Sequence, residues 1–277
     1  MSSPVALVTG CTQGGIGYSL CLELVKQGCQ VFATARNVSS MGDLEKLGCS
    51  LIALDVTDQD SIKQAIEKVI ADAGRIDILI NNAGCPAVGT LMDIDYKVIN
   101  RCINTNVIGV LSVCRAVVPH MVNQKSGKIV NVGSIVGYTA TPLAGIYSLS
   151  KAAVHSMTDV LRLELKPFGI DVTLVAPGAI KSNFGTAGLS DSLVPEDSLY
   201  RSISDDIYAR ANLSQMGATQ TEDFAEHVVS RVLNKTPRYI TYGSNSFISL
   251  VLYYLPAFVK DYALFKRFGL DKIKINN

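Results

Sequence analysis

The chain has 277 residues, of which 48% are hydrophobic and 18% charged, a balance that supports a large buried core and excludes an intrinsically disordered protein. Its formal net charge is +1, so there is no overall basic field to attract nucleic acid, and no nucleic-acid partner is expected. Seven cysteines without a CxxC pair are typical of reduced, buried thiols. The three histidines lie far apart, so we expect no metal site. The first residues lack the pattern of a signal peptide, and we expect an intracellular protein.

Short apolar runs rich in β-branched residues alternate with longer stretches of helical periodicity. Strands that are apolar on both faces and separated by helices predict a parallel sheet covered on both sides, the doubly wound α/β fold of Rossmann-like proteins. We therefore predict one such domain over residues 1–237, with an irregular insertion over 185–220, and an aromatic extension over 238–277. The six predicted strands are Val5 to Thr9, Gln30 to Ala35, Ser50 to Leu54, Ile76 to Ile80, Lys128 to Val132 and Asp171 to Val175.

The first predicted strand runs into a glycine-rich turn, and a helical pattern follows from Tyr18 to Lys26. Glycines let the backbone turn tightly and approach a pyrophosphate, and the helix directs free N–H groups and its positive end toward it. The alternative, a structural turn without a ligand, stays open for this motif alone. The expected cofactor residues of the turn are Gly10, Thr12, Gly15, Ile16 and Gly17, with Gly14 and Gly15 both open for the middle role.

The second predicted strand ends at Ala35-Arg36, where NAD-binding folds usually place an acidic residue to accept a hydrogen bond from the ribose. A guanidinium binds a 2′-phosphate through charge-assisted hydrogen bonds, whereas a carboxylate would repel it. Arg36 therefore predicts NADPH over NADH, the alternative being a solvated surface arginine.

Tyr147 and Lys151 lie four residues apart at the start of a predicted helix, so both side chains project from one face. An ammonium about 4 Å from the phenol, at an effective dielectric of about 20, would lower the tyrosine pKa by roughly three units, to near 7. Ser134, at the end of the preceding strand, is placed to hydrogen-bond a substrate oxygen as charge develops on it. Alone, a Tyr-x-x-x-Lys pair is also common on ordinary helices.

In this order the motifs resemble those of the short-chain dehydrogenase/reductase family, over roughly residues 5–235. The four residues between Gly10 and Gly15 exceed the usual three, and Ser182 stands where threonine is usual. The matching elements are the glycine turn, Asp55-Val56, Asn81 to Gly84, Asn106 to Gly109, Ser134, Tyr147 to Lys151, and Pro177-Gly178.

The resemblance implies a role for each matching residue. Tyr147 would be the general acid, Lys151 its pKa modulator and a ribose ligand, and Ser134 the group that polarises the carbonyl. Asn106 would hold a water linked to Lys151. The remaining cofactor contacts implied are Asp55 and Val56 at the adenine, Asn82, Ala83 and Gly84 along the cofactor, and Pro177, Gly178, Ile180 and Ser182 at the nicotinamide end. Relatives commonly associate through two long helices, here Tyr96 to Met121 and Ser150 to Lys166, so a homodimer or homotetramer is expected.

Three segments resemble fungal NADPH-dependent 1-acyldihydroxyacetone-phosphate reductases. They are Gly145 to His155, Leu163 to Phe168 and the tail from Phe268 to Lys272. These relatives imply reduction of a ketone on a lipophilic substrate, in the cytoplasm or on the cytosolic face of endoplasmic reticulum and lipid droplets. Three other functions stay open: a ketoreductase of fungal specialised metabolism, a hydroxysteroid-type dehydrogenase, and a membrane-associated NADPH-binding scaffold without chemistry.

Residues 238–277 hold nine of the nineteen aromatics and six basic against two acidic residues. The apolar stretch Phe247 to Val259 is too short to span a bilayer and contains Pro256. Aromatic rings mixed with cations suit a membrane or lipid-droplet surface. The alternative is that the aromatics wall the substrate pocket or an interface between subunits.

Overall fold

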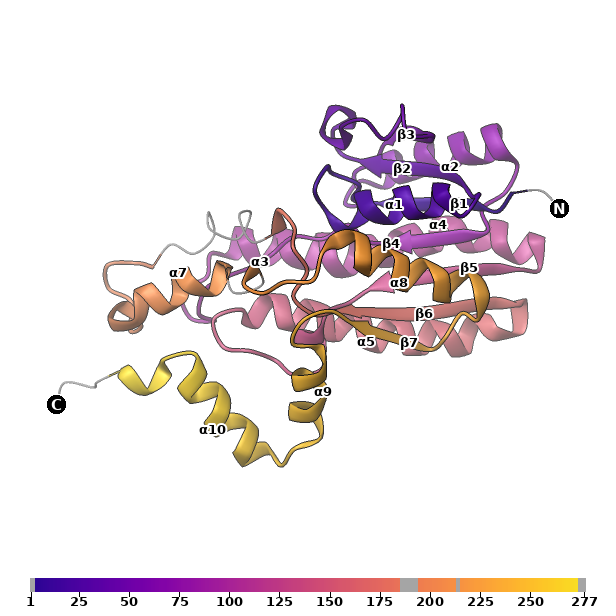
Figure 1. Ribbon diagram of the computed structural model, residues 1–277. Helices are drawn as coiled ribbons and strands as arrows, with labels where there is room; N and C mark the ends of the chain where they lie inside the picture. The colour runs from indigo at the N-terminus through magenta and orange to yellow at the C-terminus, as the bar shows by residue number, and fades with distance from the viewer. Residues whose placement is uncertain (1–2, 185–193, 213–214, 274–277) are drawn as a thin grey trace.

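Seven parallel strands form one sheet in the order β3-β2-β1-β4-β5-β6-β7 (Figure 1). The structure, a computed structural model, describes residues 3–184, 194–212 and 215–273. The chain reverses its direction of progress across the sheet between β1 and β4, and doubly wound proteins bind ligands at such a point, beyond the carboxyl ends of the strands. The strands are β1 (Val5–Thr9), β2 (Gln30–Ala35), β3 (Cys49–Ala53), β4 (Ile78–Asn81), β5 (Gly127–Val132), β6 (Ile170–Pro177) and β7 (Tyr239–Tyr242).

The predicted fold class is confirmed, and the predicted bounds of β1 and β2 agree with the structure. One strand was missed: β7 pairs with β6 in register, from Leu174 opposite Tyr239 to Pro177 opposite Tyr242. Since this strand belongs to the sheet, the segment outside the sheet begins after residue 242 and not at 238, where the extension was predicted to start. Only Ile240 of the four β7 residues is buried, so the strand lacks the apolar run that marks the other six.

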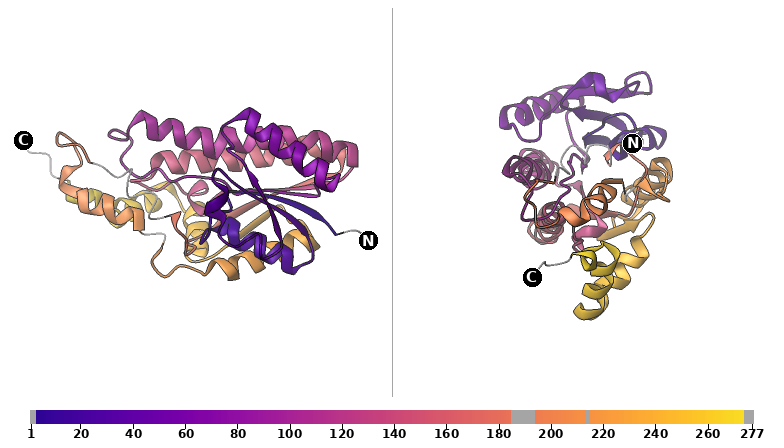
Figure 2. Two further views of the ribbon diagram at one scale, coloured as in Figure 1. Left: turned by 90° about the horizontal axis from the view of Figure 1, so that it is seen from above. Right: turned by 90° about the vertical axis from the view of Figure 1, so that its left-hand side faces the viewer.

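Helices cover both faces of the sheet (Figure 2). The larger ones are α1 (Ile16–Lys26), α2 (Gln59–Ala73), α3 (Tyr96–Ile103), α4 (Gly109–Gln124), α5 (Gly145–Leu165), α7 (Ser204–Asn212), α8 (Thr221–Asn234), α9 (Ser246–Tyr254) and α10 (Ala257–Arg267). Shorter turns are the 3₁₀ helices η1 (Val38–Met41), η3 (Ile135–Gly137), η4 (Lys166–Phe168), η5 (Arg201–Ile203) and η7 (Leu270–Lys272), and the π-helix η2 (Asn104–Ile108).

Two buried clusters hold these layers together. On one face, Leu20 and Leu24 of α1 and Phe224 of α8 pack with the side chains of β1 and β2. On the other face, Ile66 of α2 and Val113 of α4 pack with the strand side chains that point to that side of the sheet. Burial of large apolar side chains contributes roughly 1.5–3 kcal/mol each, so these two interfaces supply most of the stabilisation of the sheet.

The side chain of Asp58 caps the start of helix α2. The Asp58 carboxylate accepts hydrogen bonds from the backbone N–H groups of Asp60 and Ser61, at 2.9 and 3.2 Å. Ser61 lies in the first turn of the helix, and its hydroxyl accepts a hydrogen bond from the N–H of Asp55. The Ser61 hydroxyl therefore connects the first turn of α2 to the loop that carries Asp55.

Among the described residues, one helical stretch is long and apolar enough by composition to cross a membrane, Tyr96–Gln124. It joins α3, η2 and α4 into one continuous rod. Val113, Val117 and Met121 of this rod are fully buried in the cluster against the sheet, as in a core helix.

The chain after β7 forms two short helices that project from one end of the molecule (Figures 1 and 2). Helix α9 ends before Pro256, whose backbone caps the start of α10. Leu264 of α10 and the following Phe268 pack with Leu143, Ile203 and Ile207 in a separate small cluster. That cluster fixes α10 against α7, which lies within the predicted irregular insertion; residues 185–193 and 213–214 of that insertion fall outside the described residues.

Candidate active site

A cavity of about 650 Å³ lies beyond the carboxyl ends of β1, β4, β5 and β6. It is a continuous space with one end at the glycine turn and the other at α5. Two predicted site residues, Gly17 and Asn106, do not line it. Those that do are Gly10, Thr12, Gly15, Ile16, Arg36, Asp55, Val56, Asn82, Ala83, Gly84, Ser134, Tyr147, Lys151, Pro177, Gly178, Ile180 and Ser182.

The glycine turn is tightly packed. Gly10 and Gly14 both have φ +75°, a conformation that side chains other than glycine rarely adopt. A Cβ on Gly17 would lie 2.5 Å from the carbonyl oxygen of Gly10, so the helix packs directly on the turn. Gly15 is the N-cap of α1 in extended conformation. Gly14 and Gly15 therefore share the middle of the turn. Gly14 reverses the direction of the backbone, and Gly15 begins the helix.

The start of α1 fits a bound pyrophosphate. No side chain caps its first N–H groups, and its first turn contains no acidic residue. Unpaired N–H groups at the positive end of a helix are suited to an anion, and the neighbouring glycines leave the backbone open to approach. This wall of the cavity therefore fits the phosphates of a dinucleotide.

Asn82 connects the glycine turn to β4. Its side-chain amide donates to the carbonyl oxygens of Thr9 and Gly10, at 2.9 and 3.0 Å. The Thr9 hydroxyl accepts from the backbone N–H groups of Asn82 and Ala83, each at 3.0 Å. These four bonds hold the ends of β1 and β4 together and keep Ala83 and Gly84 at the cavity wall.

The end of the cavity at the glycine turn also carries Arg36 and Asp55. Arg36 is exposed at the end of β2, and among the described residues no carboxylate lies within 4 Å of its guanidinium. The Asp55 carboxylate accepts from the backbone N–H and the hydroxyl of Thr57, at 2.9 and 2.7 Å. Buried Val56 follows it. This end therefore offers one cation, with no ion-pair partner among the described residues, beside an apolar wall.

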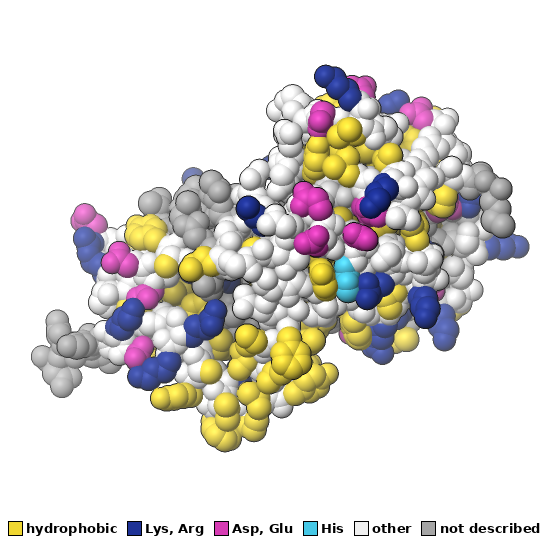
Figure 3. All heavy atoms as spheres, in the orientation of Figure 1, with side chains coloured by type: hydrophobic (Ala, Val, Ile, Leu, Met, Phe, Trp, Pro, Cys, Tyr) yellow, Lys and Arg dark blue, Asp and Glu magenta, His cyan; other side chains and the backbone are white. Residues whose placement is uncertain are grey.

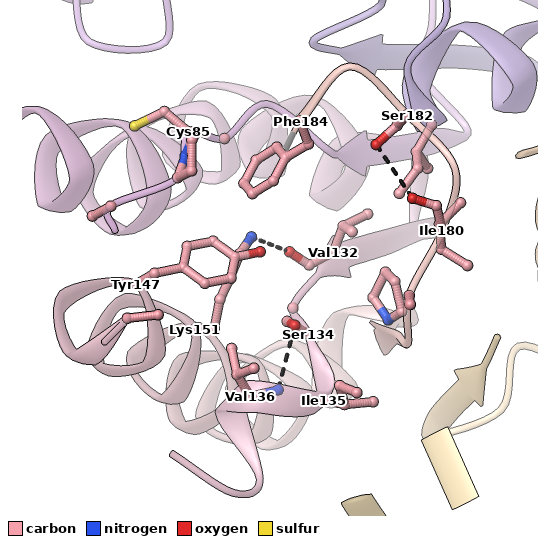
Figure 4. Close-up of a pocket in the computed structure, with 18 of the residues that line it drawn as sticks. Cys85, Val132, Ser134, Ile135, Val136, Tyr147, Lys151, Ile180, Ser182 and Phe184 are labelled. Carbon is pink, nitrogen blue, oxygen red and sulfur yellow. Dashed lines mark hydrogen bonds between the residues drawn. The ribbon is translucent and has the colours of Figure 1, made fainter. Parts of the chain in front are cut away.

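The other end of the cavity holds Ser134, Tyr147 and Lys151 (Figure 4). Tyr147 and Lys151 project from consecutive turns of α5, and the Lys151 ammonium donates to the carbonyl oxygen of Val132 at 2.8 Å. Ser134 caps η3 by accepting from the N–H of Val136 at 3.3 Å. The Ser134 backbone N–H also donates to Nε2 of His155, at 3.4 Å. The strand β5 and the helix α5 thus place a phenol, a hydroxyl and an ammonium on one wall.

Burial is the main influence on the pKa values of Tyr147 and Lys151 on this wall. It raises the pKa of Tyr147 well above its usual value, although the hydrogen bond with Ser134 and the charge of Arg210 oppose the rise. Burial also lowers the pKa of Lys151 to about 8. The predicted fall of the Tyr147 pKa to near 7 is therefore wrong for this structure, because the cost of burying the phenolate exceeds the electrostatic gain. Tyr147 is a neutral phenol that holds a proton to donate.

Asn106 lies behind this wall in the π-helix η2, with no exposed surface. Its side chain accepts from the N–H of Cys85 at 2.8 Å and donates to the Cys85 carbonyl and the Ser150 hydroxyl, each at 3.0 Å. The side chain is therefore fully engaged in joining α5 to the loop after β4. Its assignment to a bound water remains a prediction.

The loop after β6 closes the cavity. A Cβ on Gly178 would lie 2.2 Å from the carbonyl oxygen of Ser244, so the loop and the chain after β7 are in direct contact. The Ser182 N–H donates to the side-chain oxygen of Gln215 at 2.8 Å. The Phe184 ring faces the Tyr147 ring across the cavity, with centroids 5.4 Å apart (Figure 4).

Several cavity residues were not predicted from the sequence. They come from α7, α9 and α10 and from the loop after β6, and their approach depends on tertiary packing. The sequence carries one signal that points to these residues, which is the concentration of aromatic residues after 238. The main members of this group are Phe184, Arg210, Ile248, Leu252, Leu264, Arg267 and Phe268.

Comparison with known proteins gives a consistent family. The family described as short chain dehydrogenase matches residues 4–191. An NADPH-dependent 1-acyldihydroxyacetone phosphate reductase from Schizosaccharomyces pombe is 37% identical over 198 residues, covering 70% of this chain and 67% of the relative. The short-chain dehydrogenase ptmH from Penicillium ochrochloron is 34% identical and covers 98% of this chain and 100% of the relative.

Among solved structures, a short-chain dehydrogenase from Streptomyces avermitilis has a TM-score of 0.81 and 27% identity, covering 98% of both chains. The fold and the site define an oxidoreductase of the nicotinamide-dinucleotide type. The chain belongs to the short-chain dehydrogenase/reductase family.

Proposed function

We propose that the protein is an NADPH-dependent reductase that converts a ketone on a lipophilic substrate into a secondary alcohol. The observation that carries this proposal is the single cavity with Ser134, Tyr147 and Lys151 at one end and the glycine turn and Arg36 at the other. A protein that only bound the cofactor would not need the phenol, hydroxyl and ammonium on one wall. The substrate we favour is 1-acyldihydroxyacetone phosphate, the compound in the name of the S. pombe relative.

The bound dinucleotide would be held by Gly10 to Gly17, Asp55, Asn82 to Gly84 and Lys151, and its nicotinamide would supply a hydride to the carbonyl carbon. The residues of the chain do the rest. The Ser134 hydroxyl donates to the carbonyl oxygen, and the Tyr147 phenol, neutral in its buried position, delivers the proton to that oxygen. The Lys151 ammonium stabilises the phenolate that remains.

NADPH preference is the part of the proposal that depends on Arg36. The guanidinium is exposed at the end of β2 and, in the described part of the chain, has no carboxylate ion pair, so it is free to meet a 2′-phosphate. An apolar Ala35 stands where an acid would select the 2′-hydroxyl.

The test measures the affinity of NADPH and NADH for the protein and for Arg36→Ala by isothermal titration calorimetry. One charge-assisted hydrogen bond contributes about 1.5–3 kcal/mol, so NADPH affinity should fall about tenfold or more while NADH affinity stays unchanged. Equal affinities for the two cofactors in the unmodified protein would refute the preference. A panel of ketones with NADPH oxidation as the readout then tests the reaction itself.

We also propose that α9 and α10 lie on a membrane or lipid-droplet surface on the cytosolic side. Phe247, Tyr254 and Phe258 expose 76%, 81% and 75% of their surface. Hydrophobic side chains gather over these two helices (Figure 3), and Lys266 and Arg267 follow at the end of α10. Other residues of the same helices, Ile248, Leu252 and Leu264, line the cavity. The two alternatives for the tail are therefore compatible, because different faces of the helices serve them.

A further inference from the structure

Two arginines share one wall of the cavity. Arg210 comes from the last turn of α7 and Arg267 is the last residue of α10, and both line the cavity. The two helices lie at the same end of the molecule (Figure 1) and are joined by the packing of Ile207 with Leu264 and Phe268. The wall is thus held in place by a small apolar core of its own.

The charge of Arg210 is not neutralised within the described residues. Its guanidinium donates to the hydroxyl of Thr141 at 3.2 Å and lies 5.8 Å from the centroid of the Phe268 ring. Its Nε is buried and has no hydrogen-bond partner in the described part of the chain. In the part of the chain that the structure describes, no carboxylate lies within 4 Å of Arg210 or Arg267. Arg210 is half-buried, and a partly desolvated cation without a carboxylate partner among the described residues is costly, so this arrangement calls for an anion supplied from outside.

The pair lies at the catalytic end of the cavity. The charge of Arg210 acts on Tyr147, lowering the pKa of the phenol, and the charge of Arg267 acts on Arg210, lowering its pKa. Burial is the main cause of the lowering of the Arg210 pKa from its ordinary value. Arg36 and the start of α1, which suit the phosphates of the cofactor, line the opposite end. An anion between Arg210 and Arg267 would therefore belong to the substrate.

We propose that Arg210 and Arg267 bind a phosphate monoester on the substrate and so place its ketone against Ser134 and Tyr147. Two positive charges match a dianion better than a carboxylate, and guanidinium groups bind phosphate oxygens in pairs. The inference rests on the proposed function for the carbonyl chemistry, but the anion site itself is defined by the two arginines and by the lack of a carboxylate within 4 Å of either among the described residues.

The first test measures binding to the NADPH complex, in which the cofactor's own phosphate sites are filled. Hexyl phosphate is titrated by calorimetry into the complex of the unmodified protein, Arg210→Gln, Arg267→Gln and Arg231→Gln. Arg231 is exposed on α8, where it donates to a backbone carbonyl, and serves as the matched control. We expect about tenfold or greater weakening in the first two variants and none in the control. Hexanoate, hexanol and inorganic phosphate, titrated in parallel, separate a phosphate monoester from a carboxylate, an alkyl chain and a free ion.

Equal binding of hexyl phosphate and hexanol, or unchanged binding in both arginine variants, would overturn the proposal. Because Arg210 is half-buried and its Nε is inaccessible, its variant is first checked for NADPH affinity. Should it fail to fold, exposed Arg267 carries the test alone.

The second test separates this inference from the proposed function. A methyl ketone that carries a phosphate monoester and the same ketone with a free hydroxyl are compared as substrates. We expect the phosphorylated ketone to be reduced with the higher kcat/KM, by about tenfold or more, and Arg267→Gln to remove the difference. Equal reduction of both ketones would refute the anion site and leave the reductase intact. Reduction of neither, with hexyl phosphate binding still dependent on Arg267, would refute the proposed substrate chemistry and leave the anion site.

Discussion

At the residue scale, the reactive wall depends on burial. Tyr147 and Lys151 share one face of α5, and the Lys151 ammonium donates to a main-chain carbonyl while lying 5.8 Å from the centroid of the Tyr147 ring. Burial keeps the phenol neutral, and the hydrogen bond to the carbonyl of Val132 keeps the ammonium in a fixed position. This division gives a proton donor and a charge that stabilises the donor after it has reacted.

Replacing Tyr147 with phenylalanine should abolish turnover and leave NADPH affinity nearly unchanged, because only the proton donor is removed and the ring is retained. Lys151→Ala should reduce both turnover and NADPH affinity, since the same ammonium stabilises the phenolate and makes the proposed ribose contact. Steady-state kinetics and calorimetry measure the two quantities. Substantial reduction of a ketone by Tyr147→Phe would contradict the assigned proton donor.

The pH profile of reduction should report on Lys151. Burial lowers its pKa to about 8, so the ammonium is present below that pH and is lost as the pH rises through it. At saturating NADPH we expect kcat/KM for the ketone to be constant below about pH 8 and to fall above it. Lys151→Arg, which stays charged, should move the fall to higher pH. A profile of the unmodified protein that stays flat to pH 10 would argue against this role.

At the element scale, the sheet and the glycine turn could be predicted and the other half of the cavity could not. The strands β1 to β6 contain short apolar runs, and this pattern depends on local sequence alone. The strand β7 has one buried residue in four, and the π-helix around Asn106 is a change of backbone pairing without a sequence period. Arg210 and Phe268 meet because α10 folds back on α7, a contact between residues 58 positions apart in the chain.

The exposed aromatics of α9 and α10 should decide membrane binding. We expect the combined change Phe247→Ser, Tyr254→Ser and Phe258→Ser to release the protein from liposomes that contain anionic lipid, because burying each of these side chains contributes roughly 1.5–3 kcal/mol. Flotation measures the bound fraction. A deletion of residues 245–277 is a weaker test, since Ser249, Leu252 and Leu264 line the cavity.

A matched control for flotation replaces two equally exposed apolar side chains elsewhere, Met92→Ser and Leu199→Ser. This pair should leave flotation unchanged. If the unmodified protein does not float with anionic liposomes, the surface-binding proposal is wrong.

At the scale of the whole molecule, the predicted subunit contact falls on apolar surface. Ile108 next to α4, and Leu149, Val160 and Leu163 on α5, are exposed on the two helices expected to pair. Val160→Glu with Leu163→Glu should convert the dimer into monomers by light scattering, because like charges would face each other across a two-fold axis. Met92→Glu, exposed outside these helices, is the control. A monomeric unmodified protein at micromolar concentration would contradict the predicted assembly.

The cavity is built from two separate lengths of the chain. Its cofactor wall and its reactive side chains come before Phe184, while the surface that faces them is largely supplied by Arg210 and by residues between Asn245 and Phe268. Substrate choice can therefore diverge by changes near the carboxyl end alone, without disturbing hydride chemistry that is encoded upstream. Exchanging residues 245–268 between two reductases of the proposed kind should change the ketone that the recipient prefers and leave its preference for NADPH or NADH unchanged. The tail would then be a segment that can be exchanged to alter substrate specificity.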